Sequence, residues 1–242
     1  MRAAKLIVSF VVPALAWPQA GQLKTADAVL EKYKQALGGV DAIRNVQSET
    51  AHGEIEGTGI QGKATFVSYS KLFKSLFKVT RPDGTEIISG FDGSVSWNIT
   101  PKGASIDTDT PLESARRDAD LHYALHQPDY FQKLELAGIT DFEGRPCYRL
   151  HGTTHWGKDN NQFYDVQTGL LAGYRFQADD SSSALTIVVF GDYKNFGGRL
   201  VPTKLTARSG NDARTFTTTS LTYEPIPDSV FDLPPAVKAL LK

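Results

Sequence analysis

The sequence predicts a mainly β (α+β) protein whose strands form one large curved antiparallel sheet, an unclosed β-barrel wrapped over a few helices. From Asn161 to Glu224, short β-branched and aromatic runs alternate with clusters of Gly, Asn, Asp and Ser, which is the pattern of successive hairpins rather than of βαβ units. The turns Asp83-Gly84 and Asp92-Gly93 are of the kind that closes tight hairpins. Apolar and polar residues also alternate along single runs, so one face of each strand is expected to be buried.

The length and composition favour one domain. A chain of 242 residues with 40% hydrophobic residues can form a single all-β core. The formal net charge of −1 and the scattered basic residues give no nucleic-acid surface. We expect one half-barrel domain over residues 21–242 and no nucleic-acid partner.

The N-terminal residues are typical of a secretory signal peptide. Arg2 and Lys5 precede the apolar run Leu6–Val12, which is too short to span a bilayer, and small residues follow up to Ala20. A buried N-terminal strand is the alternative. We expect residues 1–20 to be removed, the mature chain to begin between Trp17 and Gly21, and its formal charge to fall to −3.

Cysteine use agrees with export. The single Cys147 excludes an internal disulfide, and no cysteine follows the apolar run where a lipid anchor would need one. No other stretch reaches the roughly 18 consecutive apolar residues of a membrane helix. The expected product is an exported, periplasmic protein without a transmembrane segment.

Helical patterns occur in two places. Thr25–Leu37 has apolar residues on one helical face and ends at Gly38-Gly39, and Val40–Val46 is expected to add a turn or two. Thr110–Gln132 is predicted as a helical insertion, with Thr110 or Asp109 as N-cap and Pro111 in the first turn. Pro128 should end or restart it.

The remaining runs are predicted strands, and a proline-rich tail follows them. Pro225–Pro234 should be extended because its prolines cannot donate to a sheet, and Pro235–Leu241 is expected to end in a helical turn. The predicted strands, in order, are Ser48–Glu56, Gly62–Tyr69, Lys74–Arg81, Thr85–Phe91, Ser94–Thr100, Gly103–Asp107, Lys133–Thr140, Pro146–Thr154, Asn161–Val166, Leu170–Ala178, Ala184–Tyr193, Leu200–Arg208 and Ala213–Tyr223.

The side chains that suggest chemistry do not form a complete catalytic set. Asp118, His122 and His126 are spaced four apart, which would place them on one face of a continuous helix as a divalent metal can use, but no further ligand and no general base between the histidines is identifiable. His151 and His155 are expected at the surface. Cys147 looks like a small packed residue.

No nucleophile elbow, phosphate loop or dinucleotide fingerprint is present either. The sequence therefore favours a binding protein over an enzyme, with no cofactor and no metal site. A metal-dependent hydrolase that uses His122 and His126 remains an alternative.

The predicted sheet is large compared with the helices that could cover it. Two helical segments and a short tail offer too little apolar cover for so many strands, so the sheet should curl around the helices and leave an apolar cleft for a hydrophobic ligand. A curled sheet that closes on its own side chains is the alternative.

Several short motifs occur in an order that resembles the LolA/LolB-like outer-membrane lipoprotein-sorting proteins. The motifs are Tyr33–Gly39, Gly90–Gly93 leading to Trp97, Asp118–Asp120, Glu143–Pro146, Tyr164–Leu171, Asp192–Lys194 and Gly197–Pro202. The resemblance covers nearly the whole mature chain. It implies an unclosed barrel with helices as a lid, and lipids or acylated proteins as ligands.

Strand alternation gives a set of candidate cleft residues. They are Phe66, Val95, Trp97, Ile99, Tyr174, Phe176, Leu185, Ile187 and Val189. The pattern favours an ordinary core tryptophan at position 97, and a cleft residue is the other interpretation. Arg116 and Arg117, on the insertion, could contact an anionic head group, although a solvated helix face is their other role. The alternative to a carrier is an envelope assembly protein that binds another protein through the sheet.

Overall fold

The computed structural model describes residues 22–177 and 185–242. The predicted signal peptide and cleavage site therefore lie outside the described residues. None of the helices in the described ranges combines the length and apolarity needed to cross a membrane.

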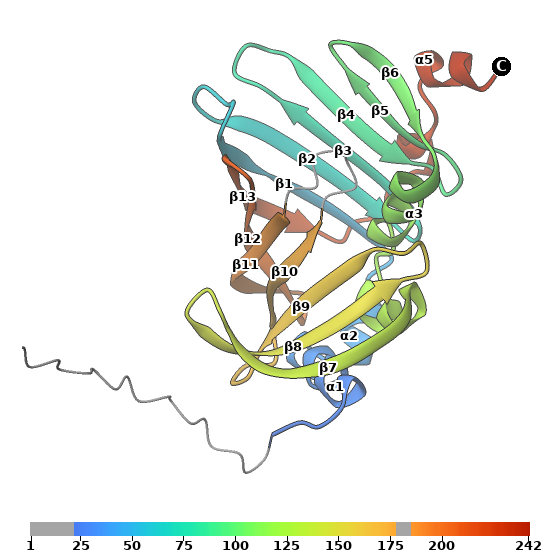
Figure 1. Cartoon of the computed structure of the whole chain (residues 1–242). Coiled ribbons are helices and arrows are strands. Elements are labelled where there is room, and N and C mark those ends of the chain that lie inside the picture. The colour runs from blue at the N-terminus through green and yellow to red at the C-terminus, as the bar shows by residue number, and fades with distance from the viewer. Residues whose placement is uncertain (1–21, 178–184) are drawn as a thin grey trace, which may run out of the picture.

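Thirteen strands in the described ranges form one antiparallel sheet (Figure 1). Their order is β6-β5-β4-β3-β2-β1-β13-β12-β11-β10-β9-β8-β7, so consecutive strands pair except β6 and β7, and β1 pairs with β13. β6 and β7 are the two free edges, and the barrel stays unclosed as predicted. The strands are β1 Ser48–Gly57, β2 Ala64–Lys71, β3 Lys74–Thr80, β4 Glu86–Phe91, β5 Ser96–Thr100, β6 Gly103–Asp107, β7 Phe131–Phe142, β8 Arg145–Thr154, β9 Asp159–Asp165, β10 Leu171–Gln177, β11 Leu185–Phe196, β12 Arg199–Ser209 and β13 Asp212–Thr222.

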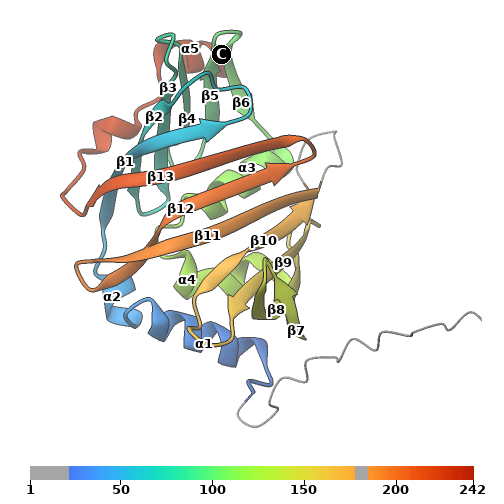
Figure 2. The ribbon, with the colours of Figure 1, turned by 90° about the vertical axis from the view of Figure 1, so that its left-hand side faces the viewer.

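The first helix covers one end of the concave face of the sheet, which we call the inner face. α1 (Ala26–Ala36) begins at Thr25, whose side chain accepts a hydrogen bond from the Ala28 N–H at 3.1 Å, and α2 (Val40–Arg44) follows. Val29 and Leu30 of α1 are buried in one cluster with Tyr148, Leu150, Tyr164 and Leu171 of the sheet. Figure 2 shows α1 and α2 at this end, with α3 and α4 on the inner side of the strands.

The predicted insertion is helical but not one helix. α3 (Asp109–Asp118), α4 (Tyr123–His126) and the 3₁₀ turn η1 (Gln127–Tyr130) are separate pieces. The buried Asp120 carboxylate explains the break between α3 and α4, because it accepts from the His122 backbone N–H at 3.0 Å and from the Tyr130 hydroxyl at 2.8 Å. Asp118, His122 and His126 therefore do not share a face of one continuous helix.

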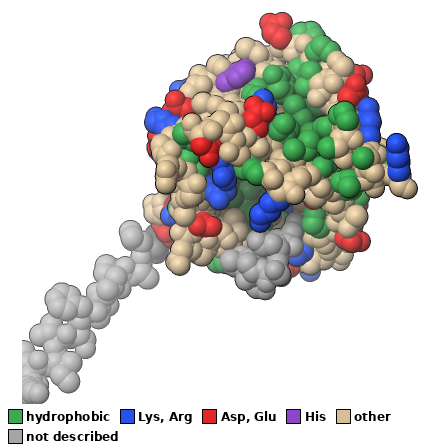
Figure 3. Space-filling model, turned by 90° about the horizontal axis from the view of Figure 1, so that it is seen from above, with side chains coloured by type: hydrophobic (Ala, Val, Ile, Leu, Met, Phe, Trp, Pro, Cys, Tyr) green, Lys and Arg blue, Asp and Glu red, His purple; other side chains and the backbone are tan. Residues whose placement is uncertain are grey.

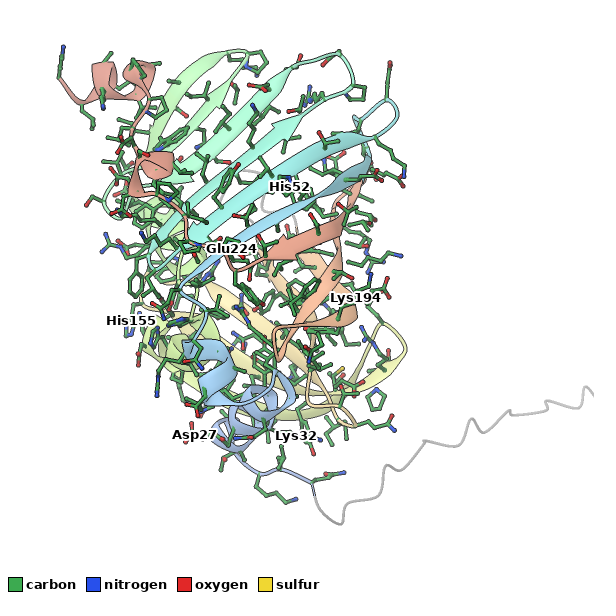
Figure 4. The ribbon with its side chains drawn as sticks, turned by 180° about the vertical axis from the view of Figure 1, so that it is seen from behind. Asp27, Lys32, His52, His155, Lys194 and Glu224 are labelled. Atoms are coloured by element: carbon green, nitrogen blue, oxygen red, sulfur yellow. The ribbon has the colours of Figure 1, made fainter. Side chains whose placement is uncertain are left out.

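The C-terminal tail covers part of the outer face. It is extended around the 3₁₀ turn η2 (Asp228–Phe231) and ends in α5 (Pro235–Lys238) and η3 (Ala239–Leu241). Asp228 pairs with Lys71 at 2.7 Å and lies 3.8 Å from Lys74. Seen from behind, the tail leaves the sheet at Glu224 and runs along the back of the first strands (Figure 4).

A β-bulge in β10 changes which side chains share a face. Leu171 pairs with Tyr164 but Gly173 pairs with Phe163, so the register shifts between them. Leu171 and Tyr174 consequently lie on the inner face, whereas Ala172 packs in a cluster with Phe142, Cys147 and Phe163. Simple alternation along the strand would place Ala172 on the same face as Tyr174 and Phe176, and the bulge prevents this.

Candidate functional site

Two apolar cavities lie on the inner face and meet at two side chains. The first, which we call the α3 lobe, has a volume of about 420 Å³ and lies between α3, the β8–β9 turn and strands β9 to β12. The second, the aromatic lobe, has about 360 Å³ and lies over β11, β12, β13 and β1 to β3. Phe190 and Leu205 line both lobes and pair across β11 and β12. We call the two lobes together the groove.

The register of the strands builds the floor of the groove. Tyr174 pairs with Val188, Phe190 with Leu205, and Leu205 with Phe216, so these side chains follow one another across four strands on one face. The six strand spacings from β10 to β3 correspond to about 29 Å along the sheet at about 4.8 Å each. The groove is therefore long as well as apolar.

Aromatic rings form the wall of the aromatic lobe. The ring centroid of Phe66 lies 5.5 Å from that of Phe77 and 6.3 Å from that of Phe216. The Phe66 ring also lies against Gly53, where an added Cβ would overlap it. Figure 3 shows hydrophobic side chains gathered beside a hollow, with Lys and Arg side chains at its margin.

Charged side chains are concentrated at the far end of the α3 lobe. Arg117, Asp118, Lys158 and Asp159 line it. The Arg117 guanidinium pairs with Asp118 at 2.8 Å and lies 5.7 Å from the centre of the Trp156 ring, in the position of a cation–π contact. This end of the groove is polar, and the Arg117 cation is held in place by Asp118 and Trp156.

A buried network of polar side chains joins the insertion to the sheet behind this lobe. Gln127 Nε2 donates to Gln162 Oε1 and to the Tyr164 hydroxyl at 2.7 Å, and the Tyr164 hydroxyl donates to Gln162 Oε1 at 2.9 Å. Burial raises the pKa of Tyr164 well above its usual value. Sequence patterns gave no sign of this network, since isolated Gln residues carry no motif and Gln162 follows three other polar residues in β9.

Comparisons with solved structures find the same fold in proteins of low sequence identity. A LolA superfamily protein from Nitrosomonas europaea matches with a TM-score of 0.61 and 16% identity over 87% of this chain and 99% of its own. A DUF1329 family protein from Desulfovibrio piger matches with 0.60, 17% identity and 87% and 98% coverage. The chain has a LolA-like fold.

A third structure agrees. A domain from Vibrio parahaemolyticus, described as an outer membrane lipoprotein-sorting protein domain, matches with a TM-score of 0.59 and 13% identity over 88% of this chain and 97% of its own. No protein-family model and no curated protein matches the sequence significantly. The resemblance to LolA-like proteins inferred from the motifs is confirmed at the level of the fold.

Within this LolA-like fold, the structure brings three of the predicted cleft residues to the groove. Tyr174 and Phe176 line the α3 lobe, and Phe66 lines the aromatic lobe. Of the two predicted head-group residues, Arg117 lines the α3 lobe. Arg116 does not: its side chain is half exposed and lies 3.7 Å from Glu113 of the same helix.

Trp97 and Ile99 require a correction, because they point away from the groove. Phe66 pairs with Val79 and Val79 with Ile87, which puts Ser96, Asn98 and Thr100 on the groove face of β5. Trp97 pairs with Gly90 on the outer face, which also carries Lys74, the tail's neighbour. Trp97 is 1% exposed, and a Cβ on Gly90 would lie 2.6 Å from its ring. Val95 precedes β5 in the turn and does not line either lobe.

The predicted residues of β11 also lie on the wrong face. Tyr174 pairs with Val188 and Arg175 with Ile187, so Leu185, Ile187 and Val189 point outward. Ile187 and Val189 pack against the cluster of Phe142, Cys147 and Phe163. The β11 residues in the groove are Val188 and Phe190, one register step from those predicted.

The two histidines of the insertion make structural contacts. His122 Nε2 lies 2.7 Å from the Val46 carbonyl oxygen, and His126 Nδ1 lies 2.9 Å from Asp120 Oδ2. In the described ranges no three His, Cys, Asp or Glu side chains are placed to hold a metal ion. Cys147 is buried, and burial raises the pKa of its thiol to about 12.

Proposed function

We propose that this protein is an exported carrier that holds a lipid, an acyl chain or the acyl part of a lipoprotein in the groove. The observation that carries the proposal is the apolar floor that continues through both lobes by way of Phe190 and Leu205. Apolar surface of this extent on a soluble domain is typical of a ligand or partner site. Lipoprotein sorting in the name of a structural neighbour points to the same class of ligand.

The free energy available from such a groove is large enough for useful affinity. Each methylene removed from water contributes about 0.8 kcal/mol, so ten buried methylenes would contribute roughly 8 kcal/mol before the costs of association. The floor that the two lobes share supplies this without a charged contact. Phe190 and Leu205 offer only aromatic and hydrocarbon surface, so binding rather than catalysis is the proposed role.

Export is part of the same proposal. The signal peptide over residues 1–20 would deliver a single domain, residues 21–242, to the periplasm, where lipids and acylated proteins need a carrier through water. N-terminal sequencing of protein recovered from its native cell tests this step. A mature N-terminus between Trp17 and Gly21 is expected, and an intact Met1 would overturn it.

A binding titration with a matched pair of variants tests the carrier proposal. Delipidated protein is titrated with a fluorescent fatty acid, and the titration is repeated with Phe190→Asp, which places a carboxylate on the floor shared by both lobes. Leu185→Asp on the same strand is the control, because Leu185 is 49% exposed and points outward.

The expected result is saturable binding by the parent protein and by Leu185→Asp, and at least a tenfold loss for Phe190→Asp, since a carboxylate against the chain would have to be desolvated. Circular dichroism must show that the variant is folded. No binding of any lipid by the parent, or unchanged binding by a folded Phe190→Asp, would contradict the proposal. Stable co-purification with an envelope protein and no lipid would then favour the assembly role.

A further inference from the structure

We propose that the ligand is a long-chain amphiphile bound in one fixed orientation. Its polar end lies beside Arg117 and Lys158 in the α3 lobe, and its chain passes over Phe190 and Leu205 into the aromatic lobe. This inference rests on the proposed function and adds to it the direction of the ligand and the chemistry of its polar end.

The two lobes differ in charge. The α3 lobe is lined by four charged side chains, Arg117, Asp118, Lys158 and Asp159. The lining of the aromatic lobe includes one charged side chain, Glu49. Glu49 lies 3.5 Å from Arg199, and its burial raises its pKa. Burying a polar group costs free energy unless the group gains hydrogen bonds. An amphiphile should therefore bind most tightly with its polar end in the α3 lobe.

In the α3 lobe, Asp118 pairs with Arg117, and Asp159 accepts a hydrogen bond from the Thr153 hydroxyl at 3.0 Å, so the lobe favours a polar end that accepts hydrogen bonds. Arginine and lysine side chains only donate. Asp118 Oδ1 lies 2.9 Å from Arg117 Nε and 2.8 Å from Nη2, which leaves the Nη1 edge of the guanidinium outside this pair. With its side chain 22% exposed and held over the Trp156 ring, this cation interacts more strongly than one in water. The polar end should therefore carry carboxylate or phosphate oxygens.

The geometry also sets a minimum chain length. Phe190 and Leu205 lie one and two strand spacings from β10, or about 5–10 Å. An extended chain advances about 1.3 Å per methylene, given C–C bonds of about 1.5 Å. An eight-carbon chain would thus end near Leu205, while a sixteen-carbon chain would extend about 20 Å and pass Phe216 of β13, which lies three strand spacings, or about 14 Å, from β10.

The experiment compares chain length and polar end in two variants. Affinities for octanoate, hexadecanoate, hexadecanol and hexadecyl phosphate are measured by displacement of a fluorescent fatty acid from the parent protein, Phe216→Ala and Arg117→Met. Thr217→Ala is the control for β13, since Thr217 is exposed on the strand's other face. Circular dichroism and thermal unfolding confirm that each variant is folded.

The two variants should give different signatures. Phe216→Ala should weaken hexadecanoate about tenfold, as expected for the loss of a buried aromatic contact, and change octanoate less than twofold. Arg117→Met should weaken octanoate and hexadecanoate alike and leave hexadecanol unchanged. Hexadecyl phosphate compared with hexadecanoate tells a phosphate from a carboxylate end.

Three results would overturn the orientation. They are an equal effect of Phe216→Ala on both chain lengths, an equal effect of Arg117→Met on acid and alcohol, and an Arg117→Met protein with parental affinity for every ligand. If the parent binds none of the four ligands, the proposed carrier function itself fails. The two failures are therefore distinguishable.

Discussion

In the buried network between the insertion and the sheet, a Gln→Leu substitution should affect stability very differently at positions 127 and 162. Gln127 and Gln162 are both 0% exposed and share a hydrogen bond. Their other contacts differ: Gln162 Oε1 also accepts from the Tyr164 hydroxyl at 2.9 Å, whereas Gln127 Oε1 is buried without a partner. Gln162→Leu should therefore be destabilising, and Gln127→Leu should be close to neutral.

The magnitudes follow from the contacts. Gln127→Leu removes two donated hydrogen bonds, worth about 1 kcal/mol each, but also removes an unpaired buried carbonyl that costs about 1–3 kcal/mol, so the free energy of unfolding should change by less than about 1 kcal/mol. Gln162→Leu takes the acceptor from the Tyr164 hydroxyl and leaves that donor unpaired. The expected loss is about 2–4 kcal/mol.

Urea unfolding followed by circular dichroism, together with thermal unfolding, measures both changes. For a domain of this size a loss of 2–4 kcal/mol lowers Tm by about 4–16 °C. Gln132→Leu is the control, because Gln132 is exposed and its hydrogen bond to the His155 carbonyl is at the surface. Equal losses at Gln127 and Gln162, or the larger loss at Gln127, would refute the reasoning.

Further predictions concern packing and titration. Gly173→Ala should lower the free energy of unfolding by about 1–3 kcal/mol in a urea melt, because the added Cβ would overlap the Val188 carbonyl and lie 2.6 Å from the Phe142 ring; Gly191→Ala, with open space around it, should not. The Cys147 thiol, whose pKa burial raises to about 12, should resist a thiol reagent at neutral pH until urea unfolds the chain, and reaction of the native protein would contradict this. Burial also raises the pKa of Tyr33 to about 12, above the unfolded value of about 10. Its contribution to stability is therefore complete below pH about 10 and lost as the pH rises toward 12, so alkaline unfolding should begin in that range. If the phenolate absorbance of the folded protein at pH about 10 already equalled that of the unfolded chain, this prediction would be wrong.

The elements were predictable because their signals are local. Thr25 caps the first helix as its side-chain chemistry suggests, and Asp-Gly turns separate β3 from β4 and β4 from β5. The LolA-like fold followed from short motifs in sequence order. The break in the insertion was less visible, because it depends on tertiary hydrogen bonds of Asp120 to Tyr130 and His126.

The side of the sheet that a strand's apolar residues face was not predictable in β5. Its alternation is regular, and Trp97 is buried as an alternating strand would suggest. Alternation fixes the phase of a strand but not the side, which depends on what covers each face. Here the tail lies over the outer face of β3 to β6, so the large aromatic residue belongs to the outer packing and the smaller polar residues face inward. Within residues 22–177 and 185–242, the proximity of Lys71 and Lys74 to Asp228 is the part of this cover that charge could have suggested.

In β11 the sequence does not alternate between apolar and polar residues, so it does not indicate which side chains face the groove. Leu185 to Phe190 is apolar at almost every position, and the structure uses both sets: Val188 and Phe190 form the floor of the groove, while Ile187 and Val189 pack outside against stacked Phe142 and Phe163 rings, 4.1 Å apart. A strand supported on its outer face can keep its inner side chains in place when the groove holds no ligand, because its position does not depend on ligand contacts. The strand is apolar on both faces, which is why its faces could not be assigned from the sequence, and this is also what a preformed groove requires. The apolar contacts that hold the strand in place lie on its outer face, and its inner face remains available to a ligand.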